Sequence, residues 1–149
     1  MECKEHIEPN QTGMSLTARA VNKEKDLDII QSWYSIRRDW QAPPDNIFPD
    51  DGVIIENNGE PIYAGWIYLP RNSNICLIDW IVGNPKMKIR KNRGIELLLI
   101  TLLRVAKQNN IIYVMSVFDN NLILDNEFKK LGFKKGSNCF NYLKRITWE

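Results

Sequence analysis

A cluster of positive charges separates two apolar stretches in the middle of the chain. Residues 86–94 read KMKIRKNRG, and five of them are lysine or arginine. The apolar stretch that follows has the spacing of a helix, whose first turn offers free backbone N–H groups and the positive end of the dipole. Phosphate groups bind readily at such a place. The segment therefore predicts a polyphosphate site, with a solvated basic loop as the alternative.

The spacing of apolar residues predicts the elements that would position this segment. The predicted order is a strand at 16–20, a helix that starts at Asn22 and ends before Pro43, strands at 53–55, 61–69 and 75–82, a helix at 92–108, a strand at 111–117, a helix ending at Leu131 and a strand from Phe140. Asn58-Gly59 is a hairpin signal, and the strand at 111–117 is expected to be parallel and buried on both faces. This order predicts an α/β fold with a central mixed sheet covered by helices.

Length and composition restrict the classes of protein. A chain of 149 residues with 44% hydrophobic residues builds one domain, here expected at residues 14–149 after a loose arm at 1–13. A net charge of +2 predicts neither nucleic acid nor membrane as a partner. Three widely spaced cysteines offer no metal site, and no apolar stretch is long enough to span a bilayer. We therefore expect a cytoplasmic protein without a metal.

Several of these segments resemble the core of the GNAT acyltransferases. They are IDWIV at residues 78–82, the basic turn that ends in RGIE at 93–96, the apolar helix after it, and Asn121 followed by FKKLGF at 128–133. The similarity covers residues 16–146, and the spacing from Asn121 to the Gly132-Phe133 pair is its best detail. The chain is similar to the small stand-alone members of bacterial or bacteriophage type.

The resemblance implies acetyl-CoA as acyl donor and assigns residues to it. In the family, the pantetheine arm pairs with free strand backbone, and amides of the next turn bind the pyrophosphate. Carried over, Ile81 and Val82 would line the thioester, and Asn121 would contact the cofactor arm. The residues implied for the pyrophosphate are Lys91, Asn92, Arg93, Gly94, Ile95 and Glu96.

Three residues depart from the family pattern, the first being Lys91, which stands where the family has arginine or glutamine. Glu96 stands where the family has glycine or alanine, and Phe128 stands where many members have a tyrosine that protonates the leaving thiolate. Because phenylalanine has no proton to give, Ser116, Tyr142 or water would take this role.

A catalytic base is also required to take a proton from the acceptor amine. Asp79 is predicted for it, because it is the only acid in an apolar strand that the resemblance places at the acyl site, where burial would raise its pKa. The alternatives are that Asp79 pairs with a neighbouring arginine or faces solvent. Glu56 on an adjacent strand is a weaker candidate.

The first helix and the loop after it would select the acceptor. Aspartates 45, 50 and 51 are placed to attract a cationic amine, and aromatic residues are expected to form a wall beside it. The predicted wall consists of Trp33, Tyr34, Trp40, Phe48 and Tyr68. The alternative for each of these rings is a place in the core.

Three functions remain open from the sequence. The leading one is an N-acetyltransferase that acts on a primary amine of a small molecule, peptide or protein. The basic segment also suits a GNAT-like protein of bacteriophage type that modifies nucleic-acid bases. The third function is a binding module without catalysis, which Phe128 and Glu96 favour. A homodimer remains open for all three functions.

Overall fold

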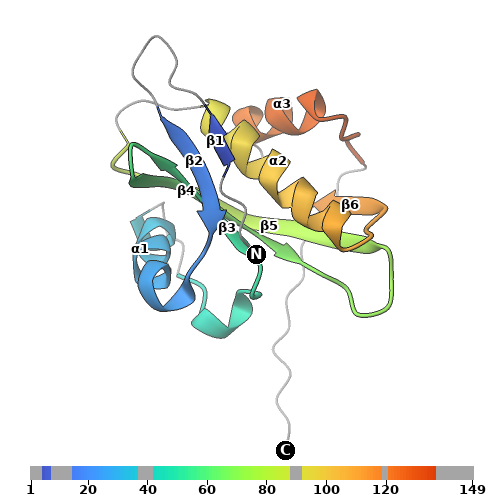
Figure 1. The fold of residues 1–149 in the computed structure, drawn as a ribbon, viewed down its shortest axis with the longest axis horizontal. Coiled ribbons are helices and arrows are strands. Elements are labelled where there is room, and N and C mark those ends of the chain that lie inside the picture. Colours follow the sequence, from blue (N-terminus) through green and yellow to red (C-terminus); the bar gives the residue numbers. More distant parts are fainter. Residues whose placement is uncertain (1–4, 8–14, 37–41, 88–91, 119–120, 137–149) are drawn as a thin grey trace, which may run out of the picture.

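The computed structural model of the chain describes residues 5–7, 15–36, 42–87, 92–118 and 121–136. Within them a single six-stranded sheet carries helices on both faces (Figure 1). The elements are β1 (Glu5–Ile7), β2 (Leu16–Ala20), α1 (Lys23–Ile36), the short 3₁₀ helix η1 (Asp45–Ile47), β3 (Gly52–Asn57), β4 (Glu60–Tyr68), β5 (Ile75–Gly83), α2 (Asn92–Gln108), β6 (Tyr113–Ser116) and α3 (Leu122–Lys130).

The sheet is mixed, as predicted. Its strands follow one another in sequence order, with antiparallel neighbours from β1 to β5 and a parallel pair of β5 and β6. The hairpin at Asn58-Gly59 is present, and both residues have positive φ. Element order and type are confirmed from β2 to α3, whereas the strand expected from Phe140 lies outside the described residues.

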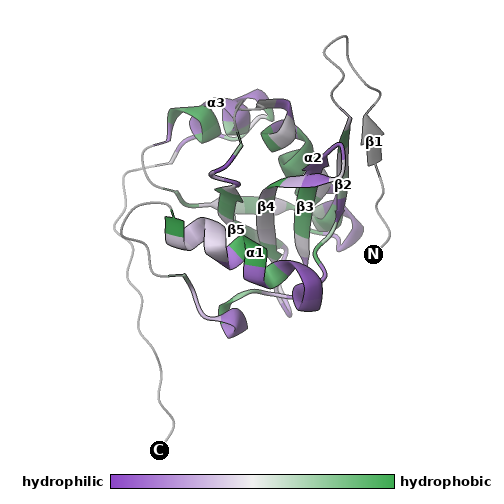
Figure 2. Ribbon diagram, turned by 90° about the vertical axis from the view of Figure 1, so that its left-hand side faces the viewer, coloured by the Kyte–Doolittle hydropathy of each residue, from purple (hydrophilic) through white to green (hydrophobic). Residues whose placement is uncertain are grey.

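Two apolar layers fill the space between the sheet and its helices. One layer joins α2 and α3 to one face, and its members include Ile55, Ile78 and Leu98. The other joins α1 to the opposite face through Ile30, Tyr34 and Trp66. Figure 2 shows α1 lying across the strands of that face. The sheet therefore separates two cores, and each candidate site residue belongs to one side.

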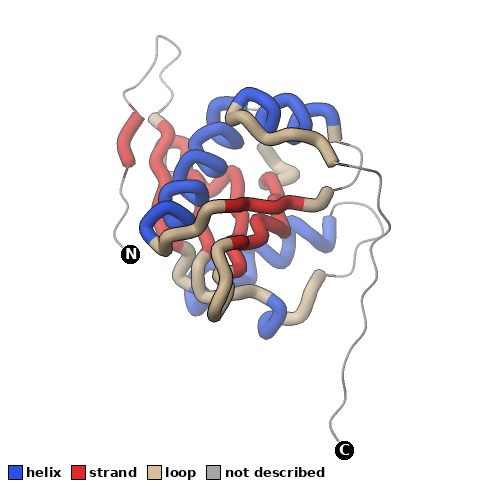
Figure 3. The backbone as a smooth tube through the Cα atoms, turned by 90° about the vertical axis from the view of Figure 1, so that its right-hand side faces the viewer, coloured by secondary structure: helices blue, strands red, loops and turns tan. Residues whose placement is uncertain are grey.

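Two expectations about strands were wrong. Residues 5–7, expected in a loose arm, form β1 and pair with Thr17 and its neighbours, a strand that three residues without periodicity do not signal. The strand at 113–116 is parallel but is not buried on both faces, because Tyr113 is 68% and Met115 is 49% exposed. β6 lies at the margin of the described sheet (Figure 3), where helices cover only one face.

Candidate active site

β5 parts from β6 halfway along its length. Residues 75–78 pair with residues 113–116, but β5 continues to Gly83. Among the described strands, none pairs with residues 79–83 on the side that faces β6. We call these residues the free edge of β5. Backbone groups at such an edge are available to an extended ligand, which makes the free edge the first part of the candidate site.

A bulge begins the free edge. Trp80 has φ +56°, a conformation that a residue with a large side chain seldom adopts. The pairing with β4 shifts at the same place, since Asp79 lies opposite Trp66 and Val82 lies opposite Ala64. Two residues of β5 therefore oppose one residue of β4, the geometry of a β-bulge. The strand changes direction at the point where its pairing with β6 ends.

Side chains bind both backbone polar groups of Trp80. The Tyr34 hydroxyl on α1 donates a hydrogen bond to the Trp80 carbonyl. The Trp80 N–H donates to Oδ1 of Asp79 at 2.7 Å. Tyr34 and Asp79 are thus connected through one residue of the bulge.

Asp79 is half-buried on the face of the sheet that carries α1. Burial raises the pKa of its carboxyl group above the ordinary value, and the Trp80 N–H partly opposes this by stabilising the charged form. Within the described residues no arginine or lysine forms an ion pair with Asp79. Burial raises the pKa of Tyr34 and of Tyr68, and the Asp79 charge adds to the rise in both.

The other predicted catalytic residues are not gathered around Asp79. Ser116 pairs with Ile78 and so shares the face of α2 and α3, opposite to that of Asp79. Glu56 is engaged in an ion pair with Arg19. Tyr142 lies outside the described residues.

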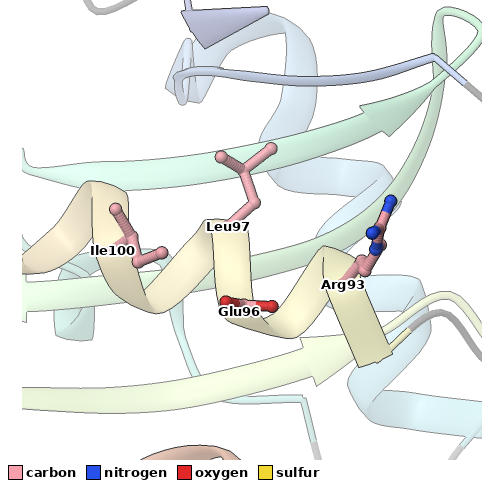
Figure 4. Close-up of a pocket in the computed structure, with 4 residues that line it drawn as sticks. All are labelled: Arg93, Glu96, Leu97 and Ile100. Carbon is pink, nitrogen blue, oxygen red and sulfur yellow. The ribbon is translucent and has the colours of Figure 1, made fainter. Parts of the chain in front are cut away.

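The helix α2 begins at Asn92, beyond the end of β5, and its first turn has two different sides. Gly94 and Ile95 are buried against the sheet, whereas Arg93 and Glu96 are exposed. Arg93 and Glu96 line a hollow of about 220 Å³ together with Leu97 and Ile100 (Figure 4). Lys91 lies outside the described residues.

Glu96 faces α3. Its charge, after that of Glu127, raises the pKa of the Lys130 ammonium group at the end of α3. The Glu96 carboxylate therefore interacts electrostatically with Lys130, whose hydrogen-bonded partner is Glu127. Gly94 and Ile95 contribute packing, so any contact they make with a phosphate would come from their backbone.

Asn121 and Phe128 both have structural roles in α3. The Oδ1 of Asn121 caps the helix by accepting hydrogen bonds from the N–H groups of Ile123 and Leu124, each at 3.1 Å. The Phe128 ring is buried between Phe118 and Phe133, with ring centroids at 5.1 and 4.7 Å. The position of Phe128 is thus a core position in this chain.

Most of the predicted aromatic wall belongs to the core. Trp33, Tyr34 and Phe48 are at most 3% exposed, because the apolar face of α1 presses them onto the sheet. Only Tyr68 is partly exposed, and its hydroxyl donates to the Ile47 carbonyl at 2.8 Å. Trp40 lies outside the described residues. These three rings therefore have the place in the core that was the alternative for each of them, and their contact with an acceptor stays a prediction.

A second hollow, of about 320 Å³, opens on the same side of the sheet as α1. It lies between the second half of α1 and the segment that follows β5, and its rim carries Glu60 and Lys86. It is lined by Ile29, Ser32, Trp33, Ile36, Glu60, Pro61, Asn84, Pro85 and Lys86. Reasoning from the sequence missed this hollow and the bulge at Trp80, since both depend on how distant segments pack.

No group of three or more metal-ligating side chains occurs among the described residues. In the same part of the chain, no helix combines the length and hydrophobicity that crossing a membrane requires.

Three solved structures with the same fold are acetyltransferases. The ribosomal-protein-S18-alanine N-acetyltransferase from Escherichia coli is 13% identical, and the match covers 82% of this chain and 79% of that one with a TM-score of 0.66. An acetyltransferase from Trypanosoma brucei is 16% identical over 87% of this chain and 99% of its own, with a TM-score of 0.64. The aminoglycoside N-acetyltransferase AAC(6')-Iy in complex with CoA is 19% identical over 94% of this chain and 100% of its own, with a TM-score of 0.59. No protein-family model and no curated protein matches the sequence.

Proposed function

Because the chain has the GNAT fold, we propose that it is an acyl-CoA-dependent N-acyltransferase, with acetyl-CoA as donor and a primary amine as acceptor. The observation that carries this proposal is the free edge of β5. Its last residue, Gly83, pairs with Tyr63, and Gly94 in the first turn of α2 lies against the same Tyr63, so an extended arm and a phosphate group have adjoining places.

The backbone of the free edge fits a pantetheine arm. Such an arm carries amide groups, which pair with free strand N–H and C=O groups as another strand would. The Val82 side chain is buried towards α1 and Ile81 packs on the α2 side, so both residues would act through their backbone. The backbone N–H groups at the start of α2 and the exposed Arg93 side chain would bind the pyrophosphate.

Asp79 is the proposed base. Acetyl-CoA, when bound, supplies a thioester carbonyl that an amine attacks. Asp79 would take the proton that the amine loses, and its raised pKa makes it a stronger base than an exposed aspartate. N–H groups of the free edge would stabilise the negative charge that develops on the carbonyl oxygen. Water, Ser116 or Tyr142 would protonate the thiolate.

Two measurements test the proposal. The first is the affinity for acetyl-CoA and for CoA by calorimetry, where absence of binding would contradict the proposal. The second is the release of free CoA thiol in the presence of amines of several classes, including a peptide with an N-terminal alanine, an aminoglycoside and a polyamine. Asp79→Asn is expected to bind acetyl-CoA and to release no thiol with an amine that the unmodified protein accepts.

The same measurements separate the alternatives. A module without catalysis would bind CoA and release no thiol with any amine. A base-modifying protein would release thiol only with nucleic acid, and its binding to DNA would weaken steeply with salt. Cys76 is a buried free thiol, which agrees with a reducing compartment; the cytoplasm stays a prediction, as does a homodimer.

A further inference from the structure

We propose that Tyr34 is a positioning residue for acyl transfer, because its hydroxyl holds the Trp80 carbonyl and thereby fixes both the Asp79 carboxylate and the free edge of β5. This inference rests on the proposed function for its catalytic consequence. Its structural part concerns α1 and β5 alone and is tested separately below.

The Tyr34 side chain is held firmly from several sides. It has no exposed surface, and its ring stacks on Phe48 at 5.8 Å and meets the Trp80 ring edge-on at 6.0 Å. The hydroxyl therefore has little freedom to choose another partner. The buried hydroxyl and the partly buried carbonyl would each lose a hydrogen bond if they separated. The contact joins residues that are 46 positions apart in the sequence.

Trp80 needs such a partner because its backbone is strained. A residue with a Cβ atom at φ +56° has steric conflicts that negative φ avoids. Without the Tyr34 hydroxyl, the Trp80 carbonyl would be free to turn and φ would relax towards negative values. The bulge would then lose its shape, and the free edge would no longer diverge from β6 in the same direction.

Relaxation of the Trp80 backbone would also change the hydrogen bonding of the Asp79 carboxylate. The Trp80 N–H, which donates to Oδ1 of Asp79 at 2.7 Å, stabilises the charged carboxylate. Among the described residues, burial raises the pKa of Tyr34 from α1 and of Tyr68 from β4, the Asp79 charge adds to both rises, and both hydroxyls are neutral near pH 7. Loss of the N–H would therefore leave burial unopposed and raise the Asp79 pKa further.

The test compares Tyr34→Phe with Thr101→Val. The control also removes a buried hydroxyl that donates to a backbone carbonyl, because Thr101 donates to Leu97 within α2 at 2.7 Å. Carboxyl NMR titration gives the pKa of Asp79, with Asp79→Asn assigning its signal, and hydrogen exchange reports on the amides of residues 80–82. Neither readout needs an acceptor or CoA.

Tyr34→Phe is expected to raise the Asp79 pKa and to speed exchange at Trp80 and Ile81 about tenfold, an order of magnitude typical of one lost hydrogen bond. Thr101→Val is expected to change neither. An unchanged Asp79 pKa in Tyr34→Phe, or equal changes in both variants, would overturn the inference. A Trp80→Gly background is a further check, because glycine adopts positive φ without strain and should make the Asp79 pKa less sensitive to Tyr34→Phe.

Transfer kinetics complete the test. With an amine that the protein accepts, Tyr34→Phe is expected to lower kcat about tenfold and to shift the acidic limb of the pH profile upward. The KM for acetyl-CoA should change less. If Asp79 titrates as expected but the unmodified protein releases no CoA thiol, the proposed function fails while the link between Tyr34 and Asp79 stands. If kcat and the pH profile are unchanged in Tyr34→Phe, the positioning role is overturned.

Discussion

Gly94 lies directly on the ring of Tyr63. A Cβ atom on Gly94 would stand 2.7 Å from Cε2 and 2.8 Å from Cδ2 of that ring, and 3.2 Å from Cδ1 of Ile62. Tyr63 is only 5% exposed, so its ring has little room to withdraw. The first turn of α2 therefore reaches β4 at a distance that only glycine permits. This contact sets where the start of α2 lies relative to the strands.

Gly94→Ala is expected to lower the free energy of unfolding by about 1–3 kcal/mol, because overpacking forces the helix or the ring to move. Binding of CoA should weaken in parallel if the start of α2 holds the pyrophosphate. Urea unfolding and calorimetry measure the two effects. Gly136→Ala is the matched control, since a Cβ atom there would meet no atom within 4 Å. Restoration of stability by adding Tyr63→Leu would confirm the steric cause.

Asp79→Asn is expected to stabilise the fold at neutral pH while it abolishes transfer. Burial raises the pKa of Asp79 in the folded protein above its value in the unfolded chain. The folded state therefore binds the proton more readily, and the charged form costs stability as pH rises through the window between the two values. Asparagine removes the charge and keeps an oxygen that accepts a hydrogen bond from the Trp80 N–H.

The stabilisation by Asp79→Asn should shrink when urea unfolding is repeated below the ordinary aspartate value of 3.8, where the carboxyl is protonated in both states. A variant that is less stable than the parent at pH 7 would contradict the assignment of a raised pKa.

Arg19→Met is expected to lower the free energy of unfolding by about 2 kcal/mol at pH 7, because it leaves the buried Asp26 carboxylate without its partner. The loss stays moderate because the Arg19 side chain is itself partly exposed. Arg19 forms two hydrogen bonds with Asp26, at 2.7 and 2.9 Å, and a third with Glu56. It thereby connects β2, β3 and the first turn of α1. Lys129→Met is the control, because its partner Asp125 belongs to an exposed pair on α3.

The effect of Arg19→Met should depend on pH. Arg19 holds the pKa of Asp26 below its ordinary value of 3.8. The stability that this pair provides is fully present above that value and is lost as pH falls through the lowered pKa. Unfolding curves of the two proteins should therefore converge in acid. A difference that stays constant from pH 7 to pH 2 would exclude the ion pair as its source.

Asn121→Ala is expected to cost about 1 kcal/mol, the usual value of a helix cap. Asn121→Ser keeps an oxygen that caps α3 and should restore most of this stability. CoA affinity of the two variants decides whether the residue has a second role. Equal affinities in Asn121→Ser and the parent would limit Asn121 to capping, whereas weaker binding in both variants would support the predicted contact with the cofactor arm.

Phe128→Tyr is expected to reduce stability by about 1–3 kcal/mol without raising kcat, because the added hydroxyl would be buried against two phenylalanine rings. Phe118→Tyr is the control, since Phe118 is 37% exposed and its hydroxyl would reach water. Unfolding curves and thiol release measure both effects. A gain in rate would show that position 128 reaches the leaving thiolate after all.

The sequence by itself determined the order of elements from β2 to α3 and the mixed character of the sheet. The period-two and helical spacing of apolar residues and the Asn58-Gly59 pair are local signals, and each acts over a few residues. The same local information singled out Asp79, because one acid within an apolar strand is visible in the sequence.

Only the tertiary structure decided where the free edge of β5 begins and what holds it. The bulge at Trp80 depends on the register between β4 and β5, and its hydrogen bond to Tyr34 joins two elements that are distant in sequence. The burial of Trp33 and Phe48, the exposure of Tyr113 and the placement of Ser116 on the other face of the sheet from Asp79 likewise follow from which face each helix covers. Such relations arise from long-range packing, which the spacing of residues along one segment does not encode.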